Sequence, residues 1–335
     1  MKLRKLIVLT ASLSLANLTH AQSMVGTTAA YFLGIDVGGR ALAMGGANVA
    51  SVNDATALYW NPGAIAQISG NEALFVHSQW LAETSFNYAA AVFHTGAGTV
   101  GLSATVLDYG KMIHTTVDEP DGTGLTFTAS DLAIGLTISR AMTDKFAIGG
   151  TAKFISQTIW HESATSLALD VGTRYKTDFR NLTMGMSISN FGLPMRMEGS
   201  DLDHFYDIAP ELYGNNSKIV SSLQTSYFNL PLIFRAGIVM DLMRNDIMSL
   251  ILAVDALHPN NNYESVNLGL EYELMRKFFL RAGRKSLFLE ETEEGLSMGF
   301  GLKIPLRGMR VNMDYGFEYF GRLKDVQNFS LSLTF

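Results

Sequence analysis

The segment Val311-Asn312-Met313-Asp314-Tyr315-Gly316-Phe317-Glu318-Tyr319 alternates large apolar side chains with polar or small ones without a break. Successive side chains of a β-strand point to opposite faces, so this period of two predicts a strand with one apolar and one polar face. The same alternation recurs in residues 146–154, 167–176 and 266–274. From residue 71 onward, the pattern therefore predicts an all-β fold.

Segments of this kind number fourteen. Many have 12 or more residues, whereas strands of soluble proteins usually have about 5–6 and a tilted membrane-crossing strand needs about 9–11. Strand length therefore favours a transmembrane barrel. The expected strands are residues 71–82, 84–94, 97–110, 125–141, 144–159, 164–177, 180–191, 229–243, 246–257, 264–275, 276–288, 294–305, 308–322 and 325–335.

The connections between these strands alternate in length. Short turns such as Thr95-Gly96 and Arg307-Gly308 follow even-numbered strands, and the longest connections, 111–124 and 192–228, follow odd-numbered ones. Outer-membrane barrels have an even number of strands, short periplasmic turns and long extracellular loops. We therefore predict an antiparallel barrel of about 14 strands in the outer membrane of a Gram-negative bacterium. Lipid and lipopolysaccharide would surround it, and both chain termini would be periplasmic.

Two other β architectures agree less well with the pattern. A secreted β-sandwich buries its apolar faces between two sheets and does not need uniformly long strands. A β-helix would show a fixed short repeat, and none is visible in the sequence.

The N-terminus and the composition restrict the function classes. Residues 1–21 look like a signal peptide, with basic Lys2, Arg4 and Lys5, an apolar stretch and a cleavage site ending at Ala21. The chain has 335 residues, a net charge of −6 and no cysteine. Phosphates would repel an acidic exported chain, which argues against nucleic acid as a partner. No cofactor motif and no zinc-like histidine cluster is visible, so we expect neither a cofactor nor a metal ion.

Residues 22–70 lack the alternation. A barrel of fourteen strands is intermediate between filled and water-conducting barrels, so its lumen would leak unless something occupied it. The small residues around Gly38 to Ala47 suit close packing against a wall, Asn53 or Asp54 is a candidate N-cap of a short helix, and Asn61-Pro62-Gly63 is a turn signal. We predict that residues 22–70 form a plug, or hatch, inside a barrel of residues 71–335.

The same segment resembles a family signature. Gly39-Arg40-Ala41-Leu42-Ala43-Met44-Gly45-Gly46-Ala47, then Asn53-Asp54-Ala55, then Tyr59-Trp60-Asn61-Pro62-Gly63 is similar to the N-terminal motif of the PorV/PorQ family. That family usually has Asn-Pro-Ala where this chain has Asn61-Pro62-Gly63. It is related to the FadL long-chain fatty acid transporter. The resemblance assigns the plug motif to Gly39, Arg40, Met44, Gly45, Gly46, Asn53, Asp54, Asn61, Pro62 and Gly63.

The resemblance implies two functions. In the first, the barrel is non-enzymatic and binds exported proteins with C-terminal signal domains, or components of a type IX secretion system, as shuttle or anchor. In the second, it is a FadL-like channel for uptake or export of hydrophobic small molecules, past a displaced hatch or through a lateral opening.

The long connection 192–228 is the candidate contact surface for a partner protein or a hydrophobic ligand. Exposed aromatic residues and methionines suit either. The alternative is that this loop folds over the barrel mouth and packs on itself, since long loops are common in such barrels. The candidate contact residues are Leu193, Met195, Phe205, Tyr206, Ile208, Leu212 and Tyr213.

The last strand closes on an aromatic residue, which is typical of outer-membrane barrels. Alternation places four apolar residues of this strand on one face: Phe329, Leu331, Leu333 and Phe335. We expect the outer-membrane assembly machinery to recognise them.

Strand parity also predicts charges of both signs facing the lumen, where they would pair with each other or with the plug, Arg40 included. The predicted set is Asp131, Lys153, Asp170, Arg174, Lys176, Arg235, Asp241, Asp255, Glu271, Glu273, Asp314 and Glu318. His161 and Ser163 share a strand face, as the base and nucleophile of a phospholipase would. No orienting Asp or Asn is evident, so we expect no enzymatic activity.

Overall fold

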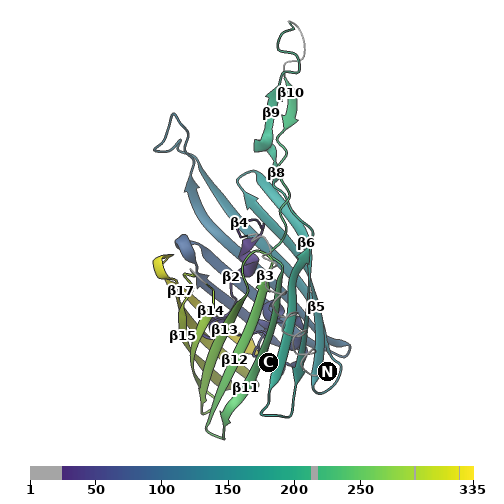
Figure 1. Ribbon diagram of the computed structural model, residues 1–335, viewed down its shortest axis with the longest axis vertical. Helices are drawn as coiled ribbons and strands as arrows, with labels where there is room; N and C mark the ends of the chain where they lie inside the picture. The colour runs from purple at the N-terminus through teal and green to yellow at the C-terminus, as the bar shows by residue number, and fades with distance from the viewer. Residues whose placement is uncertain (1–24, 213–217, 290–291, 324) are drawn as a thin grey trace, which may run out of the picture.

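The computed structural model describes residues 25–212, 218–289, 292–323 and 325–335. The expected signal peptide, residues 1–21, and the candidate contact residue Tyr213 lie outside these ranges. The described residues form a closed antiparallel barrel around an inner segment (Figure 1).

Fourteen strands of the described chain make up the barrel, as predicted. They are β1 (Glu72–Gln79), β2 (Ser85–Thr95), β3 (Gly98–Ile113), β4 (Thr126–Ala141), β5 (Phe146–Ile159), β6 (Glu162–Lys176), β7 (Thr183–Gly192), β11 (Ile233–Arg244), β12 (Met248–Pro259), β13 (Ser265–Leu274), β14 (Phe278–Leu287), β15 (Leu296–Leu306), β16 (Met309–Tyr319) and β17 (Asp325–Thr334). Each pairs with its neighbours in chain order, and β17 pairs with β1 from Glu72↔Thr334 to Gln79↔Gln327, which closes the barrel. β11 begins four residues later than expected, just after Pro231, which has no N–H to donate to a ladder.

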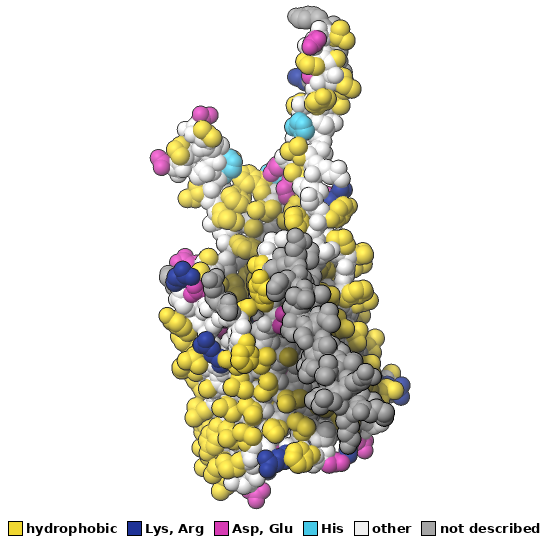
Figure 2. Space-filling view, in the orientation of Figure 1, with side chains coloured by type: hydrophobic (Ala, Val, Ile, Leu, Met, Phe, Trp, Pro, Cys, Tyr) yellow, Lys and Arg dark blue, Asp and Glu magenta, His cyan; other side chains and the backbone are white. Residues whose placement is uncertain are grey.

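The two faces of the wall follow the alternation of the sequence. In β17, Phe329 and Leu331 are exposed on the outside, while Asn328 and Ser330 are buried on the inside. Figure 2 shows hydrophobic side chains over most of the visible outer surface of the barrel body. An apolar outer band with a polar interior is the arrangement that a membrane-spanning barrel needs.

The two ends of the barrel differ. At the short-turn end, Phe335 N donates to Asn71 O at 2.9 Å, so the last residue lies where the first strand begins. At the long-loop end, β3 and β4 extend into a projecting hairpin, and the connection between β7 and β11 rises farthest (Figure 1). That connection contains β8 (Glu198–Gly199), η4 (Ser200–Leu202), β9 (Asp203–Tyr206) and β10 (Ile219–Ser222); the short helices η3 (Leu81–Glu83) and η5 (Gly321–Leu323) lie in other loops of this end.

The segment before β1 lies inside the barrel. It contains η1 (Tyr31–Gly34), α2 (Gly39–Ala43), α3 (Ala57–Trp60) and η2 (Pro62–Gln67), and most of it is buried. The N-cap residue of α3 is Thr56, so the expectation of Asn53 or Asp54 at that position is wrong. Asp54 instead accepts a hydrogen bond from Thr56 N at 2.8 Å, a local turn that delays the helix. None of the helices in the described ranges is long and apolar enough to cross a membrane.

Candidate functional site

The plug backbone touches the wall at glycines. A Cβ placed on Gly283 would lie 2.2 Å from the backbone nitrogen of Gly45, and one on Gly149 would lie 2.5 Å from the carbonyl oxygen of Pro62. Only a residue without a side chain permits such an approach. We call the nine wall glycines in contact with the plug the glycine belt: Gly101, Gly149, Gly172, Gly185, Gly237, Gly269, Gly283, Gly299 and Gly316, one from each of nine strands.

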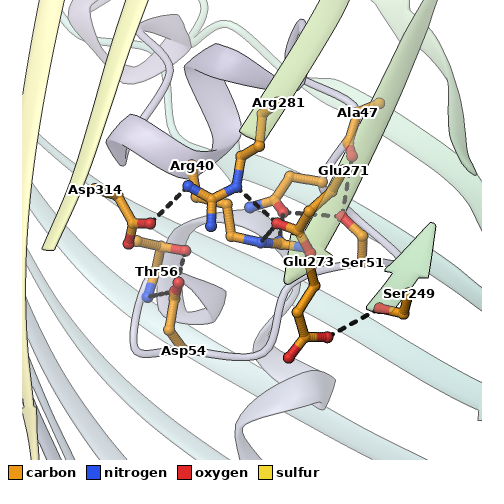
Figure 3. Close-up of polar contacts among 11 residues, drawn as sticks. Arg40, Ala47, Ser51, Asp54, Thr56, Ser249, Glu271, Glu273, Arg281 and Asp314 are labelled. Atoms are coloured by element: carbon orange, nitrogen blue, oxygen red, sulfur yellow. Dashed lines mark hydrogen bonds and ion pairs between the residues drawn. The ribbon is translucent and has the colours of Figure 1, made fainter. Parts of the chain in front are cut away.

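A buried ion network holds α2 to the wall (Figure 3). Arg40 Nε donates to Glu271 Oε2 at 2.8 Å, and Arg40 Nη1 donates to Asn48 Oδ1 at 2.8 Å. Arg281 donates to the same oxygen of Glu271 at 2.7 Å and to Asp314 Oδ1 at 2.6 Å. The expected pairing of wall charges with Arg40 is confirmed. The network ties the plug to β13, β14 and β16 together.

Asn61 fixes the second half of the plug. Its side-chain oxygen accepts from Gly63 N at 3.1 Å, which caps η2, and its amide donates to Val49 O and to Thr173 O, each at 2.9 Å. A Cβ on Gly63 would lie 2.5 Å from the carbonyl oxygen of Gly172 in the wall. The close approach accounts for glycine at position 63, since a side chain there would meet the wall.

The remaining motif residues form the turn after α2 and the part of the plug that lies toward the short-turn end. Gly45 and Gly46 have φ of 64° and 74°, a left-handed conformation that glycine adopts without strain. Met44 is fully buried against the wall at Gly269. Asn53 and Asp54 line a polar cavity at the short-turn end, beneath the Arg40 network.

An apolar cavity of about 20 Å³ lies between the plug and the wall. Its lining includes Phe32, Leu58 and Tyr59 from the plug and Gly135 and Lys153 from the wall. Burial raises the pKa of Tyr59 to about 12, although Arg235 acts in the opposite direction. This phenol therefore stays neutral across the physiological pH range.

A larger apolar groove of about 690 Å³ lies on the outer surface at the same height. Exposed side chains such as Leu102, Phe154 and Phe191 line it, together with Gly135 and Lys153. The inner cavity and the outer groove thus share two wall residues. One of the two, Gly135, has no side chain to stand between them.

The wall is irregular beside this groove. The pairing of β6 and β7 shifts between Leu169↔Phe191 and Val171↔Ile188, so that Asp170 faces two residues of β7, one of which, Asn190, has a φ of 65°. This is a β-bulge, which locally interrupts the ladder. Polar side chains hold it closed, and we call this group the bulge latch: Lys153 Nζ lies 2.7 Å from Asp170 Oδ2 and 2.6 Å from Asn190 Oδ1, and Asn190 N donates to Asp170 Oδ1 at 2.7 Å.

The middle of the long connection, from β8 to β10, projects from the long-loop end (Figure 1), whereas its two ends pack at the barrel mouth, where Asn229 O accepts a hydrogen bond from Ala29 N. Phe205, Ile208 and Leu212 are each about two thirds exposed, and Leu193 and Tyr206 are also exposed. β9 and β10 pair only with each other among the described residues, in a separate two-stranded sheet. Met195 does not belong to the contact surface, because it is buried in the core and exchanges backbone hydrogen bonds with Phe228.

The C-terminal residues expected to guide assembly lie on the outer face. Phe329, Leu331 and Phe335 are 40–52% exposed, and Leu333 is partly buried beside them. They form part of the apolar band of the last strand.

His161 has an acidic partner that the sequence did not reveal. Its Nδ1 lies 3.0 Å from both carboxylate oxygens of Asp201, while the indole N–H of Trp160 donates to its Nε2. With both ring nitrogens occupied, His161 has no free atom to accept a proton from Ser163. Among the residues that the structure covers, no group of three His, Asp or Glu side chains is placed to hold a metal ion.

Neither a family model nor a curated protein matches the chain. Solved structures do match. A FadL homologue of Pseudomonas aeruginosa has 15% identity and a TM-score of 0.53, covering 94% of this chain and 99% of that one. The chain has the fold of FadL-like outer-membrane barrels. The toluene transporters TbuX of Ralstonia pickettii and TodX of Pseudomonas putida have 11% and 12% identity and TM-scores of 0.53 and 0.55, each covering 89% of this chain and 97% and 96% of theirs.

Proposed function

We propose that this barrel is an outer-membrane channel through which small hydrophobic molecules pass beside a seated plug. One observation carries the proposal: an apolar cavity between plug and wall shares Gly135 and Lys153 with an apolar groove on the membrane-facing surface. The fold shared with toluene transporters supports it. The short-turn end would face the periplasm, as in other barrels of this class.

The passage would run sideways through the wall rather than along the barrel axis. The glycine belt and the Arg40 network seat the plug on most of the strands, so a route along the axis would have to break many contacts at once. Opening the wall at the bulge between β6 and β7 would break only the bulge latch and a few ladder hydrogen bonds. At about 20 Å³ the cavity is smaller than such a molecule, so the opening would also have to widen it before the molecule could pass into the apolar groove.

Engineered disulfides can test this route, because the natural chain has no cysteine. Leu169 and Phe191 are cross-strand partners beside the bulge, and both side chains point outward. Such partners have Cβ atoms about 4.5–5.5 Å apart, close enough for a bridge after a small shift. We expect the oxidised L169C/F191C variant to take up toluene more slowly than the same variant after reduction.

The matched control is L280C/F300C, a pair of exposed cross-strand partners in β14 and β15, away from the groove. Its uptake should not change on oxidation. A plug lock, A43C/S297C, joins α2 to β15 where Ser297 Oγ donates to Ala43 O at 3.3 Å. Uptake that stops in the oxidised plug lock but continues in oxidised L169C/F191C would replace the lateral route with an axial one.

A second candidate function is the protein-binding role implied by the PorV/PorQ resemblance. The observation that favours it is the β9–β10 hairpin, which stands away from the barrel and exposes Phe205, Ile208 and Leu212. An isolated two-stranded hairpin is marginally stable in water, so a partner that covers it would stabilise it. Its partners would be exported proteins or components of a secretion system.

Deleting residues 198–222 tests this second function. The deletion removes β8 to β10 and leaves every barrel strand intact. Co-purification from native membranes in mild detergent, followed by mass spectrometry, should then lose any partner that the wild-type chain retains. Partners retained by the deletion variant would place their contacts elsewhere.

A further inference from the structure

Arg235 of β11 is a buried cation without a carboxylate partner. It is 2% exposed, and no carboxylate among the described residues lies within ion-pair distance of it. Its guanidinium lies 5.4 Å from the ring centre of Tyr59 and 5.3 Å from that of Trp60. Its hydrogen bonds are long, at 3.3 Å to Ser189 Oγ and 3.4 Å to the hydroxyl of Tyr59, and Nε has no partner.

This arrangement differs from that of other buried cations in the wall. Arg281, Lys153 and Lys285 each have a carboxylate oxygen within 2.9 Å. Burying a charge without a counter-ion is costly, and aromatic faces replace only part of the lost hydration. The two long hydrogen bonds of Arg235 can be exchanged at low cost for a better acceptor, since hydrogen bonds weaken at such distances.

Arg235 also lines a cavity of about 100 Å³ at the long-loop end. Ile233, Leu257 and Pro259 supply apolar walls to this cavity, and Asn261 supplies an amide. Lys285, Asp36 and Glu294 lie in the same lining. Lys285 pairs with both of these carboxylates, at 3.1 Å to Asp36 and 2.9 Å to Glu294. The free positive charge of the cavity is therefore that of Arg235.

The size of the cavity limits the ligand. An apolar cavity of about 150 Å³ holds one benzene molecule, so this cavity of about 100 Å³ takes a short chain as it stands and one ring only after it expands. The planar guanidinium matches a carboxylate, which it can bind through two parallel hydrogen bonds. The site thus combines an apolar wall and several polar groups with one guanidinium that can bind an anion.

We propose that this cavity binds a small organic carboxylate, with the acidic group on Arg235 and the apolar body against Ile233 and Leu257. The inference rests on the proposed channel function and names a substrate class for it. A carboxylate site would distinguish this chain from a channel that accepts only neutral hydrocarbons. Long-chain acids are larger than the volume of this cavity.

The test compares benzoate with toluene, which has the same ring without the charge. Trp60 reports on the site, because its ring lies against Arg235; Trp80 and Trp160 are replaced by Phe to isolate its fluorescence. In protein reconstituted in nanodiscs, we expect benzoate to bind about 10-fold or more tightly than toluene, the gain typical of a hydrogen bond to a charged group. Equal binding of both probes by this protein would overturn the carboxylate site and leave the channel proposal standing.

Three variants test whether the guanidinium of Arg235 causes the preference for benzoate over toluene. R235Q should lose the preference for benzoate, and R235K, which keeps the charge without the fork, should retain part of it. R174Q is the matched control, since Arg174 also lacks a carboxylate partner among the described residues but donates to Val52 O at 2.7 Å. A preference that survives in R235Q, or disappears equally in R174Q, would contradict the proposal. Failure of both probes to bind the wild-type site would overturn this proposal and also count against the channel.

Discussion

Replacing Arg40 by Met should loosen the plug by an amount that the structure allows us to estimate. The substitution keeps an unbranched apolar stem and removes the donors to Glu271 and Asn48. Glu271 keeps its contact with Arg281 at 2.7 Å, so its carboxylate is not left without a partner. The cost should therefore be about 1.5–3 kcal/mol, as for hydrogen bonds to charged groups, rather than the about 3–5 kcal/mol of an orphaned buried charge.

That free energy corresponds to a rise of about 10- to 150-fold in the ratio of unseated to seated plug. Single-channel recording in planar bilayers measures it as the fraction of time in an ion-conducting state. The matched control is E273Q. Glu273 lies on the same strand as Glu271, but among the described residues its side chain bonds only to Ser249 of the wall, at 2.9 Å (Figure 3). Conductance in R40M equal to that of wild type, or an equal rise in E273Q, would refute the assignment of Arg40 as a plug anchor.

Further predictions concern the contact between plug and wall, the long-loop end and the assembly of the barrel in the membrane. G283A should lower the free energy of unfolding by about 1–3 kcal/mol through overpacking against the plug, whereas G96A, whose Cβ would meet nothing within 4 Å, should leave the thermal midpoint unchanged. Burial acts to raise the pKa of Glu294, but Lys285 and a hydrogen bond outweigh it and hold this pKa below its usual value. The stabilisation is thus present above the unfolded-state pKa and is lost as the pH falls through the folded-state pKa; E294Q should remove this acid-dependent part of the thermal midpoint. Deleting Phe335 should reduce the amount of folded barrel in the outer membrane, measured by heat-dependent gel mobility; an unchanged amount would count against its role in assembly.

Much of the barrel could be predicted from the sequence, because every spanning strand must present one face to lipid and one to the interior. That requirement gives a period of two over long segments, and Val311 to Tyr319 displays it without interruption. The start of a strand or helix was hardest to predict where a proline or a local turn changes the backbone hydrogen bonding. At Pro231 the missing N–H delays β11, and Thr56 rather than Asn53 or Asp54 stands at the N-cap of α3.

The contacts of the plug were harder to predict, because they depend on register between distant segments. Arg281, Arg284 and Lys285 occupy both parities of β14, so alternation alone does not show that Arg281 faces the interior and joins Arg40. The glycine belt is similar: single glycines in many strands attract no notice until the barrel closes and places them around one plug. Lumen-facing glycine in successive strands is the signal that could have revealed it.

The features that carry the functional proposals also arise from tertiary structure. Asn190 is an ordinary polar residue in the sequence, and only the pairing of β6 with β7 shows it as part of a bulge. Arg235 was expected among the lumen-facing charges, but its lack of a carboxylate partner follows from where Asp255 and Asp36 bond instead, to Val49 N and to Lys285. The sequence pattern shows which face of a strand a residue occupies, but it does not show which residues surround that side chain.

The measurement that tests the central claim most directly is the initial rate of toluene uptake by intact Gram-negative cells that express the chain. Cells with the wild-type chain, cells with the 198–222 deletion and cells with an empty vector are compared at equal amounts of folded barrel. The channel account predicts faster uptake than in the vector control, with the deletion variant equal to wild type. Uptake no faster than in the vector control would contradict it.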